Sequence, residues 1–123
     1  MLFRSTYTRT TAAQLTAAPG PHPAASRFDK GVGEALGVTA FGLYQVELPP
    51  GAATVVHDHR EDRAQDAYAI LRGSGVVIVD GEAVAVGPGD FIAVTPDSER
   101  QVRAGEDGLA FIAVCAPVTA SPS

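Results

Sequence analysis

The sequence is poor in several residue types, and each scarcity excludes a class of protein. Its 123 residues include a single cysteine, Cys115, so no disulfide framework can hold the fold together. No apolar run approaches the roughly 20 residues of a membrane-spanning helix. Residues 1–16 also lack the continuous apolar segment of a secretory signal. We therefore expect a cytoplasmic protein without membrane contact, in which Cys115 is a buried structural thiol.

Positive charge is scarce as well. Nine basic residues stand against 14 acidic ones, and the net charge is −5. The basic residues form no cluster, whereas a nucleic-acid-binding surface needs one. The sequence therefore argues against nucleic acid as a partner.

The start of the chain differs in composition from the rest. Prolines 19, 21 and 23 prevent residues 17–23 from pairing steadily as a strand or continuing a helix. We expect residues 1–26 to form an extended arm, residues 27–118 the folded domain and residues 119–123 a short tail. His22, which lies between two of these prolines, is expected to be exposed and without a function.

Short apolar segments, separated by turns rich in glycine and proline, fill the folded domain. Residues 31–37 can form one helical turn at most. The Asp80-Gly81 pair is the strongest hairpin signal, and residues 72–75 and 105–108 also suggest turns. This pattern predicts an all-β sandwich or barrel, with strands at 38–48, 66–71, 76–79, 83–86, 91–94, 101–104 and 109–116.

Two histidines, His57 and His59, are the most informative residues of the sequence, because it contains three histidines in all. Residues i and i+2 of a strand share one face. On a strand, this spacing would direct both imidazoles toward one point, as a shared metal ion requires. The alternative is that both are exposed polar residues that follow a loop.

The surroundings of these histidines resemble the first motif of the cupin family. That motif is a glycine, five residues, His-x-His, three or four residues, a glutamate, six residues and a second glycine. Gly51, His57 and His59 match it. Asp66 and Gly73 match its end, with aspartate in place of glutamate and a longer gap after His59.

A second cupin motif follows in register from Gly89. Its proline position is occupied by Thr95 and its second glycine by Asp97. Arg100 falls on the position of the histidine ligand, and Ala104 on that of the asparagine. The chain is thus similar to a bacterial subgroup of cupin-2 proteins that carry arginine at this histidine position.

The resemblance implies a double-stranded β-helix, or jelly-roll barrel, with an extended N-terminal arm. It also implies a divalent metal ion (Fe, Mn, Ni or Zn), held by His57, His59 and Asp66. Because one ligand position carries arginine and the carboxylate is short, we expect this ion to be weakly bound or absent. Similar cupins pair through sheet edges and an N-terminal strand, so a homodimer is expected.

Arg100 has two possible roles, since a guanidinium stays charged and cannot ligate a metal. It could pair with Asp66 and leave a metal-free pocket, or clamp an anionic substrate; a surface arginine is the plain alternative. Tyr68 shares the face of Asp66 on the predicted strand, and could donate a proton or bind the substrate, or simply pack in the core.

Two functions remain open at this point. The first is a metal-assisted enzyme of small-molecule metabolism, of oxygenase, isomerase or cyclase type. Its catalytic residues would be His57, His59 and Tyr68, and Arg100 would orient an anionic group. The second is a metal-free ligand-binding or sensory protein. The fold alone does not decide between them.

Overall fold

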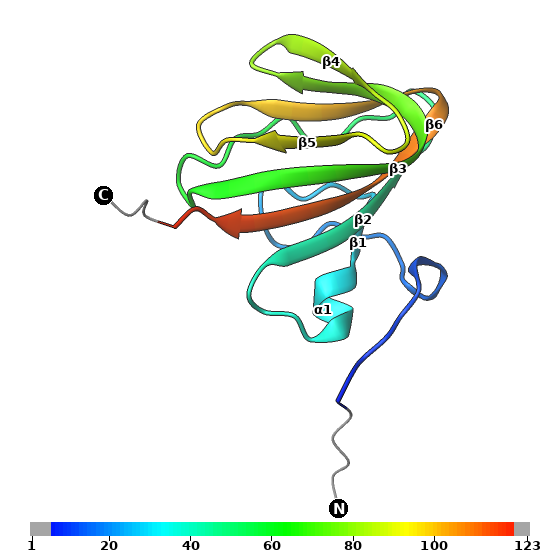
Figure 1. Ribbon diagram of the computed structural model, residues 1–123, viewed down its shortest axis with the longest axis vertical. Helices are drawn as coiled ribbons and strands as arrows, with labels where there is room; N and C mark the ends of the chain where they lie inside the picture. Colours follow the sequence, from blue (N-terminus) through cyan, green and yellow to red (C-terminus); the bar gives the residue numbers. More distant parts are fainter. Residues whose placement is uncertain (1–5, 120–123) are drawn as a thin grey trace, which may run out of the picture.

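The structure described here is a computed structural model, and it describes residues 6–119. Antiparallel β-structure dominates it (Figure 1), which confirms the predicted all-β fold. No helix within these residues has the length and hydrophobicity that a membrane crossing requires. The elements are η1 (Ala12–Gln14), β1 (Asp29–Gly31), α1 (Val32–Leu36), β2 (Gly42–Leu48), β3 (Ala64–Val79), β4 (Glu82–Val86), β5 (Phe91–Val94) and β6 (Arg100–Pro117).

The two long strands, β3 and β6, form the centre of the fold. They pair with each other, and the strand order is β1-β2-β6-β3-β4. The first half of β3 also pairs with β5, and its second half with β4. Figure 1 shows the result, with β4 and β5 beside different halves of β3, and with β2, β1 and α1 beyond the second half of β6.

The predicted turns at residues 72–75 and 105–108 are wrong, because β3 and β6 run through them. Gly73 pairs with Leu109, and Gly75 pairs with Ala104, so residues 105–108 stand opposite Ser74 alone. The glycines in these segments allow a shift in the strand register, and the chain does not reverse its direction there. The hairpin at Asp80-Gly81 is confirmed, because both residues have the positive φ of a type I′ turn.

Gly73 tolerates no side chain in this register shift. Its φ is 82°, and an added Cβ would overlap the carbonyl oxygen of Gly108. Replacement of Gly73 with alanine should therefore lower the free energy of unfolding by about 2–4 kcal/mol, as measured by urea denaturation. The control Gly87→Ala places its methyl group in open space. Equal losses in the two variants would contradict this explanation.

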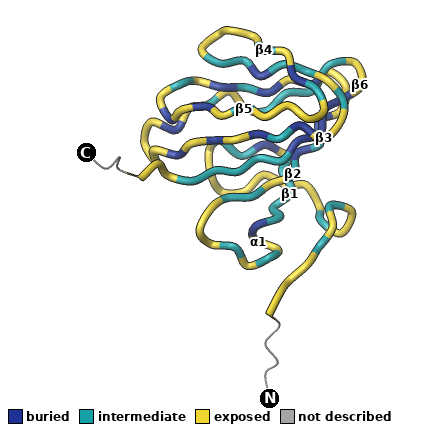
Figure 2. Tube along the Cα trace, viewed as in Figure 1, coloured by how far each residue is buried: buried dark blue, intermediate teal, exposed yellow. Residues whose placement is uncertain are grey.

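The hydrophobic core fills the interior of the barrel. Burial alternates along the first half of β3, where Ala64, Asp66, Tyr68 and Ile70 point inward. Figure 2 shows buried segments concentrated on β3 and β6. The inward-facing hydrophobic residues that pack together include Val46, Leu48, Ile70, Val77, Val102, Leu109 and Phe111. The period of two along β3 thus places a carboxylate and a phenol in an otherwise apolar interior.

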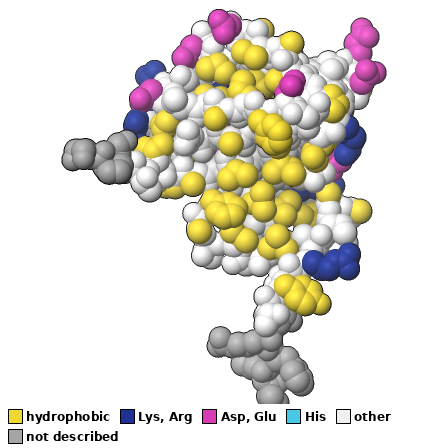
Figure 3. Space-filling view, in the orientation of Figure 1, with side chains coloured by type: hydrophobic (Ala, Val, Ile, Leu, Met, Phe, Trp, Pro, Cys, Tyr) yellow, Lys and Arg dark blue, Asp and Glu magenta, His cyan; other side chains and the backbone are white. Residues whose placement is uncertain are grey.

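Several large hydrophobic side chains are exposed. Phe91 on β5 is 81% exposed, and Leu71 on β3 and Phe41, just before β2, are also exposed. Figure 3 shows hydrophobic side chains spread over the face of the molecule that is turned toward the viewer. In other proteins, large exposed apolar surfaces are often covered by contacts between subunits. The homodimer expected from the sequence stays a prediction.

The arm turns back toward its own barrel before it enters β1. The amide of Ala18 donates to the carbonyl of Asp29, and Lys30 Nζ donates to the carbonyl of Ala12. The helical turn expected at residues 31–37 is α1, which ends at Gly37 with a left-handed φ of 77°. Residues 1–5 of the predicted arm and 120–123 of the predicted tail lie outside the described residues.

Candidate functional site

His57 and His59 belong to the segment that connects β2 and β3, not to a regular strand as expected. His57 forms an isolated bridge with Arg100, in which each backbone amide donates to the other residue's carbonyl, at 3.0 and 2.8 Å. The amide of His59 donates to the carbonyl of Pro96 at 3.0 Å. These bonds hold the two rings edge to face, with their centroids 5.0 Å apart.

Hydrogen bonds fix the same tautomer in both histidines. Nδ1 of His57 lies 2.8 Å from the carbonyl oxygen of Val55, which can only accept a hydrogen bond. Nδ1 of His59 lies 3.0 and 3.2 Å from the carboxylate oxygens of Asp62. Both rings therefore carry a proton at Nδ1. In the neutral form, each has its free lone pair on Nε2.

The two Nε2 atoms converge on Asp66. They lie 3.7 Å (His57) and 3.4 Å (His59) from the same carboxylate oxygen, Oδ2. Metal–ligand bonds of about 2.0–2.2 Å at tetrahedral angles would place two donor atoms about 3.4 Å apart. Lone pairs and a carboxylate in this arrangement repel one another unless a proton or a cation lies between them. His57, His59 and Asp66 are thus placed to hold a metal ion.

Asp66 is ionised in this environment although it is 4% exposed. Burial raises the pKa of its carboxyl group, but His57, His59, Cys115 and Arg100 together outweigh burial, and the net pKa is lowered. The two histidines contribute to this lowering when their Nε2 atoms carry a proton. The hydroxyl of Tyr68 donates to Oδ2 at 3.1 Å. Burial and the neighbouring Asp66 raise the pKa of Tyr68 well above its ordinary value, so this phenol keeps its proton at neutral pH.

Arg100 lies behind Asp66 and is 1% exposed. Its Nε is 3.6 Å from Asp66 Oδ2, and its Nη2 donates to the carbonyls of Val94 and Thr95 at 3.3 and 2.5 Å. Nε and Nη1 have no hydrogen-bond partner within residues 6–119. This position favours the ion pair with Asp66 over direct contact with a substrate.

The histidines and Asp66 open onto a cavity of about 170 Å³. Its wall combines apolar side chains with histidine, aspartate and hydroxyl side chains that could orient a small molecule. Arg100 is not among the described residues that line it. The lining comprises His22, Ala24, Ala25, Ser26, Asp29, Tyr44, Val46, Thr54, His57, His59, Asp62, Asp66, Tyr68, Val102, Phe111, Ala113 and Cys115.

Cys115 lies in this wall and is only partly buried, which corrects the expectation of a buried thiol. Burial, and then the charge of Asp66, raise the pKa of its thiol to about 12. The thiolate is the reactive and metal-binding form of cysteine. Cys115 is therefore a neutral part of the wall at neutral pH.

Comparison with known proteins identifies the family of this barrel. The family described as "Cupin domain" matches residues 44–116, which is more than half of the chain. The chain is a cupin. Comparison with curated proteins finds no match.

Solved structures agree with this assignment. A cupin protein from Bacteroides fragilis is 24% identical with a TM-score of 0.76, over 98% of this chain and 92% of that one. A predicted oxalate decarboxylase from Thermotoga maritima is 26% identical with a TM-score of 0.64, over 73% and 79%. A sugar phosphate isomerase of the cupin superfamily from Silicibacter pomeroyi is 26% identical with a TM-score of 0.65, over 73% and 59%.

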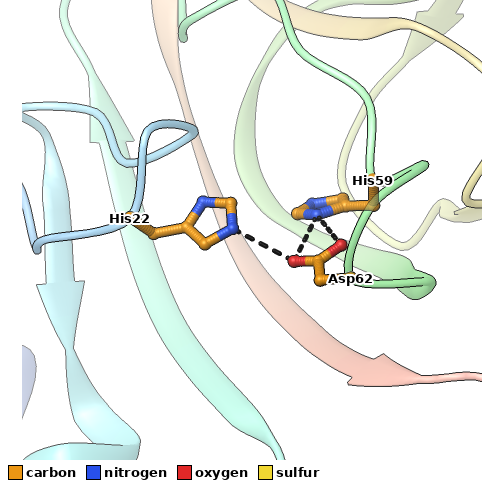
Figure 4. Close-up of side chains that lie close together, drawn as sticks. All are labelled: His22, His59 and Asp62. Carbon is orange, nitrogen blue, oxygen red and sulfur yellow. Dashed lines mark hydrogen bonds and ion pairs between the residues drawn. The ribbon is translucent and has the colours of Figure 1, made fainter.

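His22 and Asp62 are among the cavity residues that sequence reasoning missed. His22, expected to have no function, is exposed but lines the cavity, and its Nε2 lies 3.0 Å from Asp62 Oδ2. Figure 4 shows His22 and His59 on either side of the Asp62 carboxylate. Asp62 lies in the charged segment after the histidines, which resembles an ordinary solvated loop. Neither residue belongs to a cupin motif, and only the folded arm brings them together.

Proposed function

We propose that this cupin is a metal-assisted enzyme that acts on a small organic molecule in the barrel cavity, with His57, His59 and Asp66 as ligands of a divalent ion. The observation that carries the proposal is the convergence of two Nε2 lone pairs on one ionised carboxylate oxygen. Two histidines and one carboxylate leave coordination positions open, as in facial-triad sites. Iron, manganese, nickel and zinc are the ions to test.

The roles of the side chains follow from their environment. When bound, a divalent ion would polarise an oxygen of the ligand and stabilise negative charge that develops there. Tyr68 lines the cavity, and its hydroxyl donates to Asp66 and holds the orientation of that carboxylate. Its proposed role toward the ligand is that of a hydrogen-bond or proton donor. His57 and His59 keep their Nε2 atoms directed at the centre.

The cavity restricts the substrate. A volume of about 150 Å³ takes a molecule of benzene's size, and this cavity measures about 170 Å³. None of its described lining residues is lysine or arginine, whereas three are aspartates. That composition disfavours the doubly charged phosphate of a phosphorylated sugar, the substrate class after which the Silicibacter pomeroyi isomerase is named, more than it disfavours a single negative charge. A small carboxylate or enolate, whose one charge the metal ion would balance, is the substrate class that we propose.

Arg100 would orient such an anion through charge and not through contact. Its guanidinium offsets the charge of Asp66 at a distance of 3.6 Å. A divalent ion would then leave a net positive charge at the centre, which favours an ionised oxygen of the ligand. This role replaces the direct clamp considered from the sequence.

The same ion pair supports the second candidate, a metal-free ligand-binding or sensory cupin. If Arg100 alone neutralises Asp66, the cavity can hold a neutral ligand without any metal. This candidate and the enzyme differ in one measurable property, which is whether the purified protein binds a divalent ion.

Calorimetric titration of chelator-treated protein with Mn²⁺, Fe²⁺, Ni²⁺ and Zn²⁺ tests the proposal. We expect one site per chain that binds weakly and loses its ion on dialysis against chelator, because arginine occupies one ligand position. The variant Arg100→His should bind more tightly. Absence of binding by any of the four ions at millimolar concentration would favour the metal-free candidate, and a tightly held native ion would refute the expected weakness.

A further inference from the structure

The arm builds one wall of the cavity from residues that no cupin motif contains. Five of the lining residues, 22, 24, 25, 26 and 29, belong to the arm or to the beginning of β1. Ser26 braces this wall, since its amide and hydroxyl donate to Asp29 at 3.0 and 2.9 Å. The amide of Ala25 donates to the carbonyl of His22 at 3.0 Å. His22 therefore sits at the tip of a defined turn and not on a loose tail.

The tautomer of His22 is fixed by its own turn. Its Nδ1 lies 3.0 Å from the backbone amide nitrogen of Ala24, which can only donate. Nδ1 is thus the acceptor, and the ring proton resides on Nε2. This Nε2–H donates to Asp62 Oδ2 at 3.0 Å. A protonated Nε2 cannot ligate a metal, so the cluster of His22, His59 and Asp62 is a chain of hydrogen bonds and not a second metal site.

Asp62 is the middle member of this chain. Its Oδ2 accepts from His22, and its Oδ1 accepts from Nδ1 of His59 at 3.0 Å and from the amide of Ala64 at 3.3 Å. The Asp62 side chain is 41% exposed. Because so much of it faces water, its orientation depends on these partners. A carboxylate that accepts from the far nitrogen of a metal-binding histidine fixes the ring and its tautomer.

We propose that His22 is a positioning residue that couples the N-terminal arm to the metal centre. Through Asp62 it holds His59 in the Nδ1–H tautomer with Nε2 directed at Asp66, so docking of the arm closes the cavity and raises metal affinity together. The effect on metal affinity rests on the proposed function, whereas the effect of His22 on the tautomer of His59 concerns the metal-free protein.

The experiment compares His22→Ala with His22→Gln. Glutamine can place an amide N–H near the position of Nε2, so it should restore the bond to Asp62, whereas alanine cannot. Gln14→Ala serves as the control, because it alters the hydrogen bond to the amide of Thr11 in the same arm, and Gln14 does not line the cavity. Two quantities are measured in each variant: the tautomer of His59 from ¹⁵N chemical shifts of the metal-free protein at one fixed pH, and the affinity for Co²⁺ from its visible absorption.

We expect His22→Ala to populate both tautomers of His59 and to reduce Co²⁺ affinity by about 10-fold, the lower end of the effect of losing a partner behind a ligand, because Asp62 itself remains. His22→Gln and Gln14→Ala should stay within about threefold of the wild type. An unchanged His59 tautomer in His22→Ala, or an unchanged affinity, would overturn the proposal. If the wild type itself binds no Co²⁺, the affinity coupling falls with the proposed function, and the tautomer measurement alone decides whether His22 positions His59.

Discussion

Replacement of His59 with alanine is expected to weaken divalent-ion binding by more than about 100-fold, beyond the usual effect of losing an outer partner. His59 is 6% exposed, and its Nε2 faces Asp66 Oδ2 at 3.4 Å. Its loss would leave one histidine and one carboxylate, too few for a stable site of this kind. Calorimetric titration of the chelator-treated variant measures the change.

Asp58→Asn is the matched control for this experiment. Asp58 lies between the two histidines in sequence, but it is exposed and does not line the cavity. Its variant should bind the ion as the wild type does. Wild-type affinity in His59→Ala would show that the ion binds elsewhere or that the site is not a metal centre.

Arg100→Ala should produce the largest loss of stability, about 3–5 kcal/mol in the free energy of unfolding. This is the usual cost of breaking a buried charged pair by removing one partner. The variant loses the donor to the carbonyls of Val94 and Thr95 and leaves Asp66 buried without its cation. Urea denaturation measures the loss. Arg103→Ala, an exposed arginine on the same strand, should change stability by less than about 0.5 kcal/mol.

The pH dependence of this variant gives a second check. The pKa of Asp66 is lower in the folded protein than in the unfolded chain, so its ionisation stabilises the fold above the unfolded pKa. That stabilisation is lost as the pH falls through the folded pKa. Without Arg100, the folded pKa should rise, and acid destabilisation should begin at a higher pH. A loss of stability that is the same at every pH would contradict a role for Arg100 in charge compensation.

Sequence reasoning located the residues whose neighbours are close in the chain or share a strand. The period of two along β3 predicted that Asp66 and Tyr68 share the inward face, and both side chains meet inside the barrel. Counting from Gly89 placed Arg100 at the histidine position of the second motif, and in the structure Arg100 lies directly opposite His57. These relations need only local geometry and a family pattern.

The remaining features depend on contacts that no short segment contains. A glycine-rich segment such as residues 72–75 is typical both of a turn and of a register shift within a strand. Which of the two forms here depends on the pairing of β3 with β6. The role of His22 depends on the fold of an arm that lies 40 residues before Asp62. Cys115 lies in an apolar segment of the sequence, which suggests a buried position. Only the folded structure shows that it lines the cavity.

The position of β6 has a consequence for how the protein folds during synthesis. β6 comes last among the strands, yet it lies between β2 and β3 in the sheet. The ribosome therefore releases β2 and β3 before the strand that joins them exists, and their edges stay unpaired until residues up to Pro117 have emerged. Strand pairing over such long separations is slow, and unpaired edges favour aggregation. Nascent chains of this cupin should consequently depend on chaperones until β6 is inserted.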